Sequence, residues 1–408
     1  MDTTCVIAGG GPAGMMLGLL LARAGIEVTV VEKHGDFLRD FRGDTVHAST
    51  IRLLDELGLG LAFRALPQSR VQNFELPGRD GTLVVLGDLT TLTPPYDYVA
   101  LVPQWDLLDL LAEAGRKEPT FRLVLDTEVT GLLKAADRVL GVSTRTTDGI
   151  EGEVRATLVV ACDGRTSVVR RAAGLVSRAY RVPFDTWWFR LPRHPAEQER
   201  DEGLRPVFDA GQILLSIPRT SYFQLAYFTA KGDDARLRAE GVERFRARIA
   251  HLRPDLADRV EELASMDDVH MLDVKLDRLR RWYRPGLLCL GDAAHAMSPA
   301  GGVGINLAIQ DAVAAATLLA EPLRRGRLTT ADLARVQHRR WWPTVVLQTG
   351  QRLLHRVIFA PLVAGRVPRA PQVARVLATR VPGFTRVPAQ LIAFGPRPEH
   401  APDFARRP

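Results

Sequence analysis

The sequence predicts an α/β fold, with a Rossmann-like lobe, a second lobe built on a β-sheet, and a C-terminal helical segment. Three observations predict it. The first 32 residues read as a strand, a glycine-rich turn, a helix and a second strand. Two later strands each end in a turn that carries an aspartate, and between them lies a stretch rich in β-branched and aromatic residues. A chain of 408 residues is long enough for such lobes and a large core.

The N-terminal unit alternates strand and helix. Residues 5–8 are an apolar strand, residues 12–24 have helical composition, and residues 27–31 are a β-branched strand. Glu32 ends the second strand, where a carboxylate can accept a hydrogen bond from a ribose 2′-hydroxyl. The same negative charge disfavours a 2′-phosphate.

The turn between the first strand and the helix has the GxGxxG spacing. Gly9, Gly11 and Gly14 are its glycines, and Pro12 and Ala13 lie within it. In this pattern the first glycine makes the turn, the second lets a pyrophosphate approach, and the third allows the helix to pack on the strand. We therefore expect a dinucleotide here, although the turn itself does not distinguish FAD from NAD.

Two further strands end in an aspartate. The segment ATLVVACDGRTSVVRRAAG is a strand that ends at Asp163 and precedes a helix. The segment GLLCLGDAAHAMSPAGGVGINLAIQDA is a strand that ends at Asp292, followed by a glycine-rich loop and an Ala-rich helix. The carboxyl ends of parallel strands form the ligand-facing edge of an open α/β sheet. Either aspartate alone is equally well explained as a helix cap, but both behind a GxGxxG turn favour a cofactor site.

Together these motifs resemble the single-component FAD-dependent monooxygenases of the para-hydroxybenzoate hydroxylase type. The resemblance covers roughly residues 1–345 and rests on GGGPAG with Glu32, on CDG at 162–164, and on GDAAHAMSPAGGVGINLAIQD. It implies non-covalent FAD, with Asp292 at the ribityl chain, Asp163 near the pyrophosphate and Pro299 beside the ring. The cofactor-binding residues that it implies are Gly9, Gly11, Pro12, Ala13, Gly14, Glu32, Arg42, Gln104, Asp163, Asp292, Pro299, Gly302, Gly304, Ile305 and Asn306.

Within that set, Arg42 resembles a basic contact near the phosphates, and Gln104, which opens a helix, resembles a polar contact to the cofactor. A helix is expected to begin near Gly304. Its positive end would point at the flavin N1 and O2, where negative charge develops on reduction. His295, also in the glycine-rich motif, is expected to have a structural role in the loop.

The resemblance also implies the reaction. NADPH or NADH reduces the flavin, O₂ adds at its C4a carbon, and the resulting hydroperoxide hydroxylates an aromatic or polyketide-like small molecule. Because the flavin carries this chemistry, we assign no catalytic side chain. The sequence has no second GxGxxG motif, in keeping with a nicotinamide donor that binds transiently.

Three alternatives stay open. An FAD-dependent reductase or dehydrogenase would keep the same cofactor lobe without inserting oxygen. A flavin halogenase would carry a WxWxIP motif and a lysine reaching the tunnel, but TWWFRLP resembles that motif only superficially, and no lysine lies between Lys33 and Lys117. A non-redox protein would use FAD as a scaffold for substrate binding or cyclisation.

The pattern divides the chain into three parts. The predicted FAD-binding domain is discontinuous, the predicted substrate domain is rich in aromatic strands, and the rest is a C-terminal helical region. Their ranges are 1–70, 98–178 and 270–330 for the first, 71–97 and 179–269 for the second, and 331–408 for the third.

Strand alternation identifies candidate substrate contacts. In RTSYFQLAYF, Tyr222, Gln224 and Phe228 share one face of a strand, and we take them as candidates, although the pattern does not say which face lines a pocket. Arg219 resembles a family arginine that lies over the flavin. His47 stands on the segment after the second strand, which in the family passes near the flavin ring. These two are the candidates for a catalytic role.

Composition and short sequence patterns exclude several classes of partner and binding site. The net charge of +7 is not clustered in one basic arm, so we expect no nucleic acid partner. The three cysteines lie in apolar strand-like runs and indicate a reducing cytoplasm. No stretch is apolar enough to span a membrane, and no HxH or CxxC grouping indicates a metal. For the C-terminal region we favour a helical cap over the flavin lobe, with a basic amphipathic membrane contact as the alternative.

Overall fold

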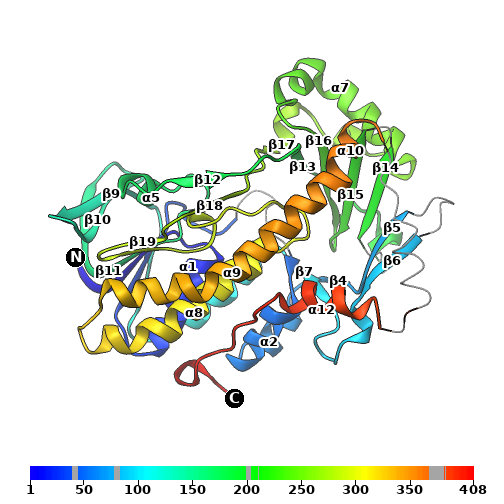
Figure 1. Ribbon diagram of the computed structural model, residues 1–408. Coiled ribbons are helices and arrows are strands. Elements are labelled where there is room, and N and C mark those ends of the chain that lie inside the picture. Colours follow the sequence, from blue (N-terminus) through cyan, green and yellow to red (C-terminus); the bar gives the residue numbers. More distant parts are fainter. Residues whose placement is uncertain (39–44, 78–82, 199–203, 210, 367–380, 382) are drawn as a thin grey trace.

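The computed structural model describes residues 1–38, 45–77, 83–198, 204–209, 211–366, 381 and 383–408. It shows two lobes, one built on a mixed eight-stranded sheet and the other on a five-stranded antiparallel sheet (Figure 1). Helix α9 (Thr330–Leu354) packs against both, because its Leu333 and Val336 join the core of the first lobe and its Leu347 and Leu354 join that of the second.

The first sheet has a parallel centre. Its strands run in the order β20-β11-β1-β2-β8, and all four pairings are parallel. The central strands are buried runs of apolar residues, as expected where both faces of a parallel sheet are covered. Their bounds are β1 (Asp2–Ala8), β2 (Val28–Val31), β8 (Phe121–Val124), β11 (Glu151–Ala161) and β20 (Leu287–Cys289).

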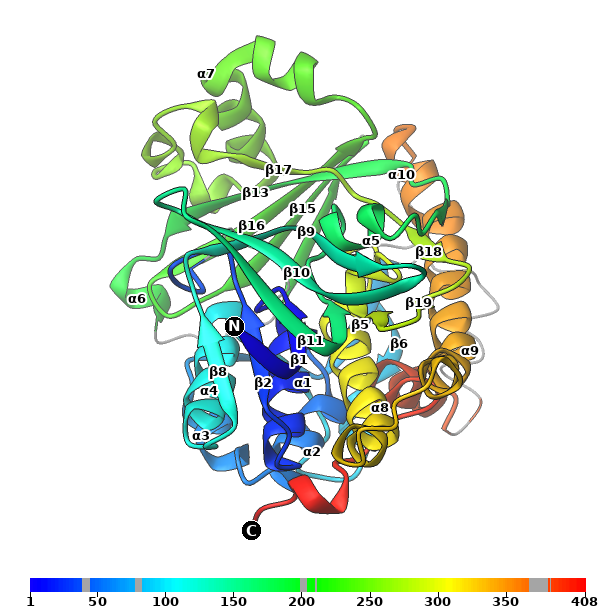
Figure 2. The ribbon, with the colours of Figure 1, turned by 90° about the vertical axis from the view of Figure 1, so that its left-hand side faces the viewer.

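Antiparallel strands extend this sheet, and three helices cover it. Strand β19 (Tyr283–Arg284) borders β20, while β10 (Arg138–Thr146) joins β11 to β9 (Thr127–Ala135). Helix α1 (Pro12–Arg23) packs against α4 (Gln104–Arg116) and α8 (Gly304–Arg324) (Figure 2). Side chains of these helices and of the sheet form the largest hydrophobic core among the described residues. Pro12 opens α1 at a position where its missing N–H costs no hydrogen bond.

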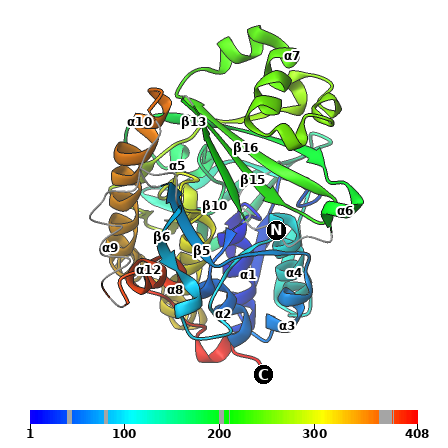
Figure 3. The ribbon, with the colours of Figure 1, turned by 90° about the vertical axis from the view of Figure 1, so that its right-hand side faces the viewer.

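The second lobe is an antiparallel sheet, as predicted, with α7 (Asp234–Leu252) lying over one face (Figure 3). Strand β17 lies beyond residue 269, the limit predicted for this lobe. Phe223, Leu225 and Tyr227 point toward α7, where they pack with Phe245 and Ile249. In the order of the sheet, the strands are β14 (Arg205–Asp209), β15 (Gln212–Pro218), β16 (Tyr222–Ala230), β13 (Phe184–Pro192) and β17 (His270–Leu272).

Shorter helices, strands and turns complete the two lobes and the segments between them. The small sheets are β3 (Thr45–Val46), β7 (Val99–Leu101) and β4 (Ser69–Val71); β5 (Asn73–Pro77) and β6 (Leu83–Asp88); and β12 (Ser177–Ala179) and β18 (Asp277–Leu279). The remaining helices are α2 (Ala48–Glu56), α3 (Gly60–Ala65), α5 (Val168–Ala172), α6 (Pro195–Gln198), α10 (Ala360–Val363) and α12 (Arg386–Phe394), with a π-helical turn over His355–Phe359. Short 3-10 turns occupy Leu89–Thr91, Pro254–Leu256, Val260–Glu262, Met266–Asp268, Gly291–Ala293 and Asp403–Ala405.

The C-terminal region is helical and then folds back on the first lobe. Helix α9 runs through the buried Pro343, because packing against both lobes offsets the backbone hydrogen bond that proline removes. After α12 the chain returns to α1, and Arg23 Nη1 donates to the carbonyl of Ala405 at 2.8 Å. In the part of the chain that is described, no helix has the length and apolar character needed to cross a membrane.

Candidate active site

Four turns meet at one edge of the first sheet. Glu32, Gly9, Asp163 and Asp292 each follow one of the adjacent parallel strands β2, β1, β11 and β20, at their carboxyl ends. The backbone holds these turns side by side, since the Gly9 N–H donates to the carbonyl of Val31 at 2.8 Å. The sequence placed each residue after a strand, and the strand order now brings all four together.

The glycines of the first turn differ in what surrounds them. Gly9 has φ +102°, and a Cβ there would lie 2.5 Å from the carbonyl oxygen of Cys162. A Cβ on Gly14 would lie 2.0 Å from the carbonyl oxygen of Gly9. A Cβ on Gly11 would meet nothing within 4 Å. The protein itself therefore requires Gly9 and Gly14, whereas Gly11 faces open space beside the turn.

Acidic side chains flank that space. Glu32 is 2% exposed, and its Oε2 accepts from the Gly10 N–H at 2.7 Å, which ties the end of β2 to the glycine turn. Asp163 Oδ2 accepts from the Val169 N–H at 3.1 Å in the first turn of α5. Asp163 Oδ1 is buried and has no hydrogen-bond partner among the described residues. Burial raises the pKa of this carboxyl above its usual range.

Arg165 is a site residue that the sequence did not indicate. Its Nε donates to Asp292 Oδ2 at 3.0 Å, and its Nη1 is buried without a hydrogen-bond partner in the described chain. The only signal was an arginine directly after Asp163-Gly164, in a sequence with many arginines. The backbone of this turn is held by Arg170, whose Nη2 donates to the Arg165 carbonyl at 2.7 Å.

The side chain of Asn306 anchors the glycine-rich loop that leads into α8. Its Oδ1 accepts from the His47 N–H and from Thr50 Oγ1, both at 2.8 Å, and its Nδ2 donates to the carbonyls of Thr45 and Gly302. Its amide is thus fully used within the protein. A ligand at this loop would therefore be met by the backbone N–H groups of Gly304, Ile305 and Asn306, which open the helix.

Gly302 also serves the loop itself. It has φ +62°, and a Cβ there would lie 2.6 Å from Thr45 Oγ1. Pro299 stands earlier in the same loop, and its carbonyl accepts from the Gly302 N–H at 3.0 Å. The close approach to β3 explains why glycine occupies position 302.

His47 is buried in the interior of the protein. It is 2% exposed, and its Nδ1 lies 2.5 Å from the carbonyl oxygen of Ile392 in α12. Burial lowers the pKa of the imidazole, so the ring is neutral near pH 7. It borders a small cavity of about 20 Å³ that is also lined by Leu391, large enough for one water. These contacts indicate a structural residue.

Arg219 and Gln224 form a polar contact under the second sheet. Arg219 Nη1 donates to the carbonyl of Leu101 at 2.6 Å, and its Nη2 donates to Gln224 Oε1 at 3.2 Å. Both side chains are buried, at 6% and 1% exposure. Strand β7 ends at Leu101, and Gln104 opens α4 three residues later, so this contact links the second sheet to the cofactor lobe.

The three candidate substrate contacts lie on one face of β16 but contact different parts of the protein. The Tyr222 ring lies 4.7 Å from the guanidinium of Arg190, which also covers Trp105 next to Gln104. Phe228, at the other end of β16, packs against Phe359, with ring centroids 5.7 Å apart. The structure therefore places Tyr222 and Gln224 near α4 and β7, and Phe228 near the C-terminal helix.

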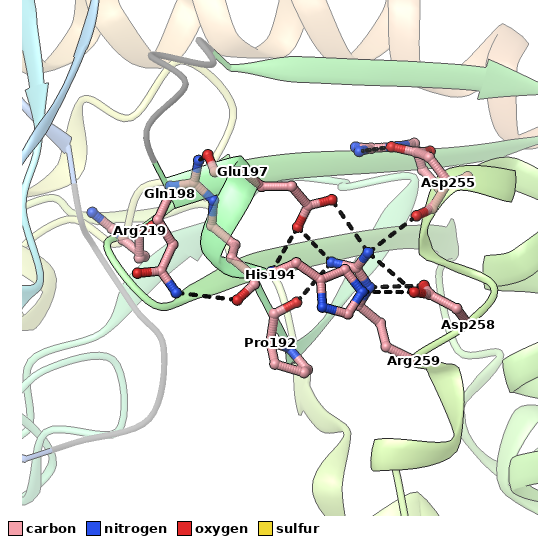
Figure 4. A network of polar contacts seen from close by, with 10 residues as sticks. Pro192, His194, Glu197, Gln198, Arg219, Asp255, Asp258 and Arg259 are labelled. Atoms are coloured by element: carbon pink, nitrogen blue, oxygen red, sulfur yellow. Dashed lines mark hydrogen bonds and ion pairs between the residues drawn. The ribbon is translucent and has the colours of Figure 1, made fainter.

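A polar network borders the turn between β15 and β16 that carries Arg219 (Figure 4). Arg193 Nη1 donates to the carbonyl of Arg219 at 2.6 Å. Next to it, Arg259 donates to Glu197 Oε2 at 2.6 Å and to the carbonyl of Pro192 at 3.1 Å. Arg259 and His194 lower the pKa of Asp258 to about 2, so this carboxyl is ionised over the physiological range. Arg42, the remaining predicted cofactor contact, lies outside the described residues.

Comparison with known proteins agrees with this arrangement. Residues 2–341 match a family model described as an FAD binding domain. The chain is 37% identical over 405 residues to 6-methylpretetramide 4-monooxygenase of Streptomyces rimosus. This alignment covers 96% of this chain and 92% of that protein. It is 33% identical over 324 residues to 12-dehydrotetracycline 5-monooxygenase/anhydrotetracycline 6-monooxygenase of Streptomyces rimosus subsp. rimosus, over 76% of this chain and 60% of that one.

A solved structure shows the same fold. Pseudomonas aeruginosa PqsL in complex with 2-aminobenzoylacetate superimposes with a TM-score of 0.73 over 89% of this chain and 97% of the PqsL chain, at 23% identity. The family model matches most of the chain, and the relative with 37% identity matches nearly all of it. The chain therefore belongs to the FAD-dependent monooxygenases, the family that its glycine turn and two aspartate turns resemble.

Proposed function

We propose that this monooxygenase hydroxylates an aromatic, polyketide-like small molecule, with FAD as its cofactor, O₂ as the oxygen source and NADPH or NADH as the transient electron donor. One observation carries the proposal. The relative that matches 96% of this chain at 37% identity is named for the oxygenation of 6-methylpretetramide. The substrate of this chain is accordingly expected to be an aromatic, polyketide-like compound related to 6-methylpretetramide.

The residues at the sheet edge fit FAD. Gly11 faces open space where a pyrophosphate would approach, and two buried polar atoms from the turn after β11, Asp163 Oδ1 and Arg165 Nη1, lack hydrogen-bond partners in the described chain. We assign the adenosine ribose to Glu32, the pyrophosphate to Gly11, Asp163 and Arg165, and the ribityl chain to Asp292. Bound FAD supplies the redox and oxygen-activating chemistry.

The chain's own residues orient the reactants and exclude water. The N-terminal N–H groups of α8 would present the positive end of the helix to a flavin ring bound at the glycine-rich loop. The inner side of the second sheet carries Trp188 and Leu215, which pack in one cluster with Met297 and Val303 of that loop. The amide of Gln224, which accepts from Arg219, lies on the same side of the sheet. An apolar surface with few polar groups suits a flat aromatic ligand and keeps water from the reacting atoms.

Substrate is expected to accelerate flavin reduction. Because no dedicated nicotinamide domain is visible in the sequence, the flavin must be presented to a transient donor, and substrate occupancy shifts the population toward that state. Stopped-flow bleaching of the flavin by NADPH, with and without an aromatic polyketide, measures this. Without substrate, NADPH oxidation should be slow and should end mostly as H₂O₂.

The same experiment separates the alternatives. Equal reduction rates with and without substrate, and no oxygenated product, would favour an FAD-dependent reductase. A product rearranged without NADPH would favour use of FAD as a scaffold.

We further propose a cytoplasmic location, supported by the three free cysteines Cys5, Cys162 and Cys289.

FAD affinity is expected to fall as the pH rises. Burial raises the pKa of Asp163, so its carboxyl takes up a proton at a higher pH than usual, and the neutral form can donate from Oδ1 to a phosphate oxygen. Above the raised pKa the carboxylate repels the pyrophosphate instead. Fluorescence titration of the apoprotein with FAD, from the usual pKa of an aspartate upward, tests this. The Asp163→Asn variant should show a much flatter profile, and a flat profile in the unaltered protein would contradict the prediction.

A further inference from the structure

A chain of buried ionisable side chains runs from the glycine-rich loop to the C-terminal segment. Its members, here called the ion chain, are His295, Asp311, Arg340 and Glu399. Asp311 and Arg340 are fully buried, and His295 and Glu399 are 1% and 3% exposed. Burial raises the pKa of Asp311, but His295 and Arg340 outweigh it and hold that pKa below its usual range, so the carboxylate is ionised.

One end of the ion chain holds the loop next to Asp292. Asp311 Oδ2 accepts from the Gly291 N–H at 3.2 Å and lies 2.5 Å from His295 Nε2. Gly291 has φ +56°, a conformation that side chains other than glycine rarely adopt, and a Cβ there would lie 3.1 Å from that of Ala308. Asp292 follows directly, so the hydrogen bond to Asp311 helps to fix the direction in which Asp292 leaves β20.

The other end is in the last ten residues of the chain. Arg340 donates from Nε to Asp311 Oδ1 at 3.1 Å and from Nη1 to Glu399 Oε1 at 3.2 Å. Arg339 donates to the same carboxylate from Nη2 at 2.6 Å. Glu399 thus neutralises the side of Arg340 that faces away from Asp311.

We propose that Glu399 is a positioning residue for FAD, which sets the geometry of the Gly291–Asp292 turn through Arg340 and Asp311. In a low-dielectric interior each charge of a chain polarises the next, and removal of one member leaves the others incompletely paired. Loss of the Glu399 charge lets Arg340 move toward the C-terminal carbonyls and weakens its hold on Asp311. This inference rests on the proposed position of FAD beside Asp292.

The experiment compares two anchors of the same C-terminal segment. Glu56 accepts from the Ala401 N–H at 2.7 Å and lies 2.5 Å from His400 Nδ1, but it does not contact the ion chain. Glu399→Gln should weaken FAD binding by about tenfold and alter the visible circular dichroism of the bound flavin. Glu56→Gln should leave both unchanged. Apoprotein melting temperatures serve as the folding control.

Each outcome decides the proposal. Wild-type FAD affinity in folded Glu399→Gln overturns it, and so does an equal loss in Glu56→Gln, which would mean that the segment only needs to be docked. If Glu399→Gln does not fold, Arg340→Lys takes its place, because lysine keeps the charge but cannot reach both carboxylates with the same geometry. Failure of both to fold, or normal FAD binding by Arg340→Lys, also overturns it. Normal FAD binding by Asp292→Ala would instead contradict the position assigned to FAD.

Discussion

Gly11→Ala is expected to leave the apoprotein folded and to weaken FAD binding by about ten- to a hundredfold. A Cβ at position 11 meets no protein atom within 4 Å, so the apoprotein has no reason to change. In the complex the same Cβ would stand in the space assigned to the pyrophosphate, and crowding of this kind costs about 1–3 kcal/mol. Fluorescence titration of the apoprotein with FAD, alongside thermal unfolding without FAD, measures the two effects separately.

Gly14→Ala is the matched control for this prediction. Alanine inside an exposed helix is usually favoured over glycine by about 1 kcal/mol, but here its Cβ would lie 2.0 Å from the carbonyl oxygen of Gly9. The clash is between the new Cβ and a backbone carbonyl that cannot move aside, so both apoprotein stability and FAD binding should be lost. If Gly11→Ala binds FAD as the unaltered protein does, the pyrophosphate does not approach this turn.

Asp292→Ala is expected to weaken FAD binding by about ten- to a hundredfold with little effect on the folded apoprotein. A carboxylate that accepts from a ribityl hydroxyl makes a charge-assisted hydrogen bond, whose loss costs about 1.5–3 kcal/mol. The side chain of Asp292 is 30% exposed, and its ion pair with Arg165 lies near the surface, so the apoprotein depends on it little. Equilibrium dialysis with FAD, and melting of the apoprotein, check both parts.

Asp292→Asn separates charge from shape at this position. Asparagine keeps an acceptor for the ribityl hydroxyl but loses the attraction for Arg165, so its FAD affinity should lie between those of the unaltered protein and Asp292→Ala. If Asp292→Ala remains folded and keeps full FAD affinity, Asp292 only orients Arg165 and the turn.

The cofactor edge was predictable because its determinants are local. A glycine turn between a strand and a helix, and an aspartate at the end of a buried strand, are short patterns whose backbone geometry is set by neighbouring residues. The start of α8 at Gly304 and of α4 at Gln104 followed from the same kind of signal and is confirmed by the structure. That four turns would meet at one edge followed from the rule that parallel strands share a carboxyl end.

Which face of a strand looks inward was decided only by the tertiary structure. Alternation in β16 separates Tyr222, Gln224 and Phe228 from Phe223, Leu225 and Tyr227, but both sets are apolar enough to be buried. The apolar side of α7 takes the second set, which turns the first toward the cofactor lobe. The sequence of β16 alone does not predict which of its faces packs against α7, because that depends on where α7 lies in the fold.

Long-range pairs between charged side chains were equally invisible in the sequence. Arg165 meets Asp292, and Arg340 joins Asp311 to Glu399, across separations of many residues, and the sequence holds 54 lysines and arginines from which to choose. What the sequence by itself determined is the family, the cofactor lobe and the turns to which we assign FAD, because these depend on local backbone patterns. Only the tertiary structure decided which charges are buried together, since burial arises from packing of distant segments and makes each such pair energetically significant.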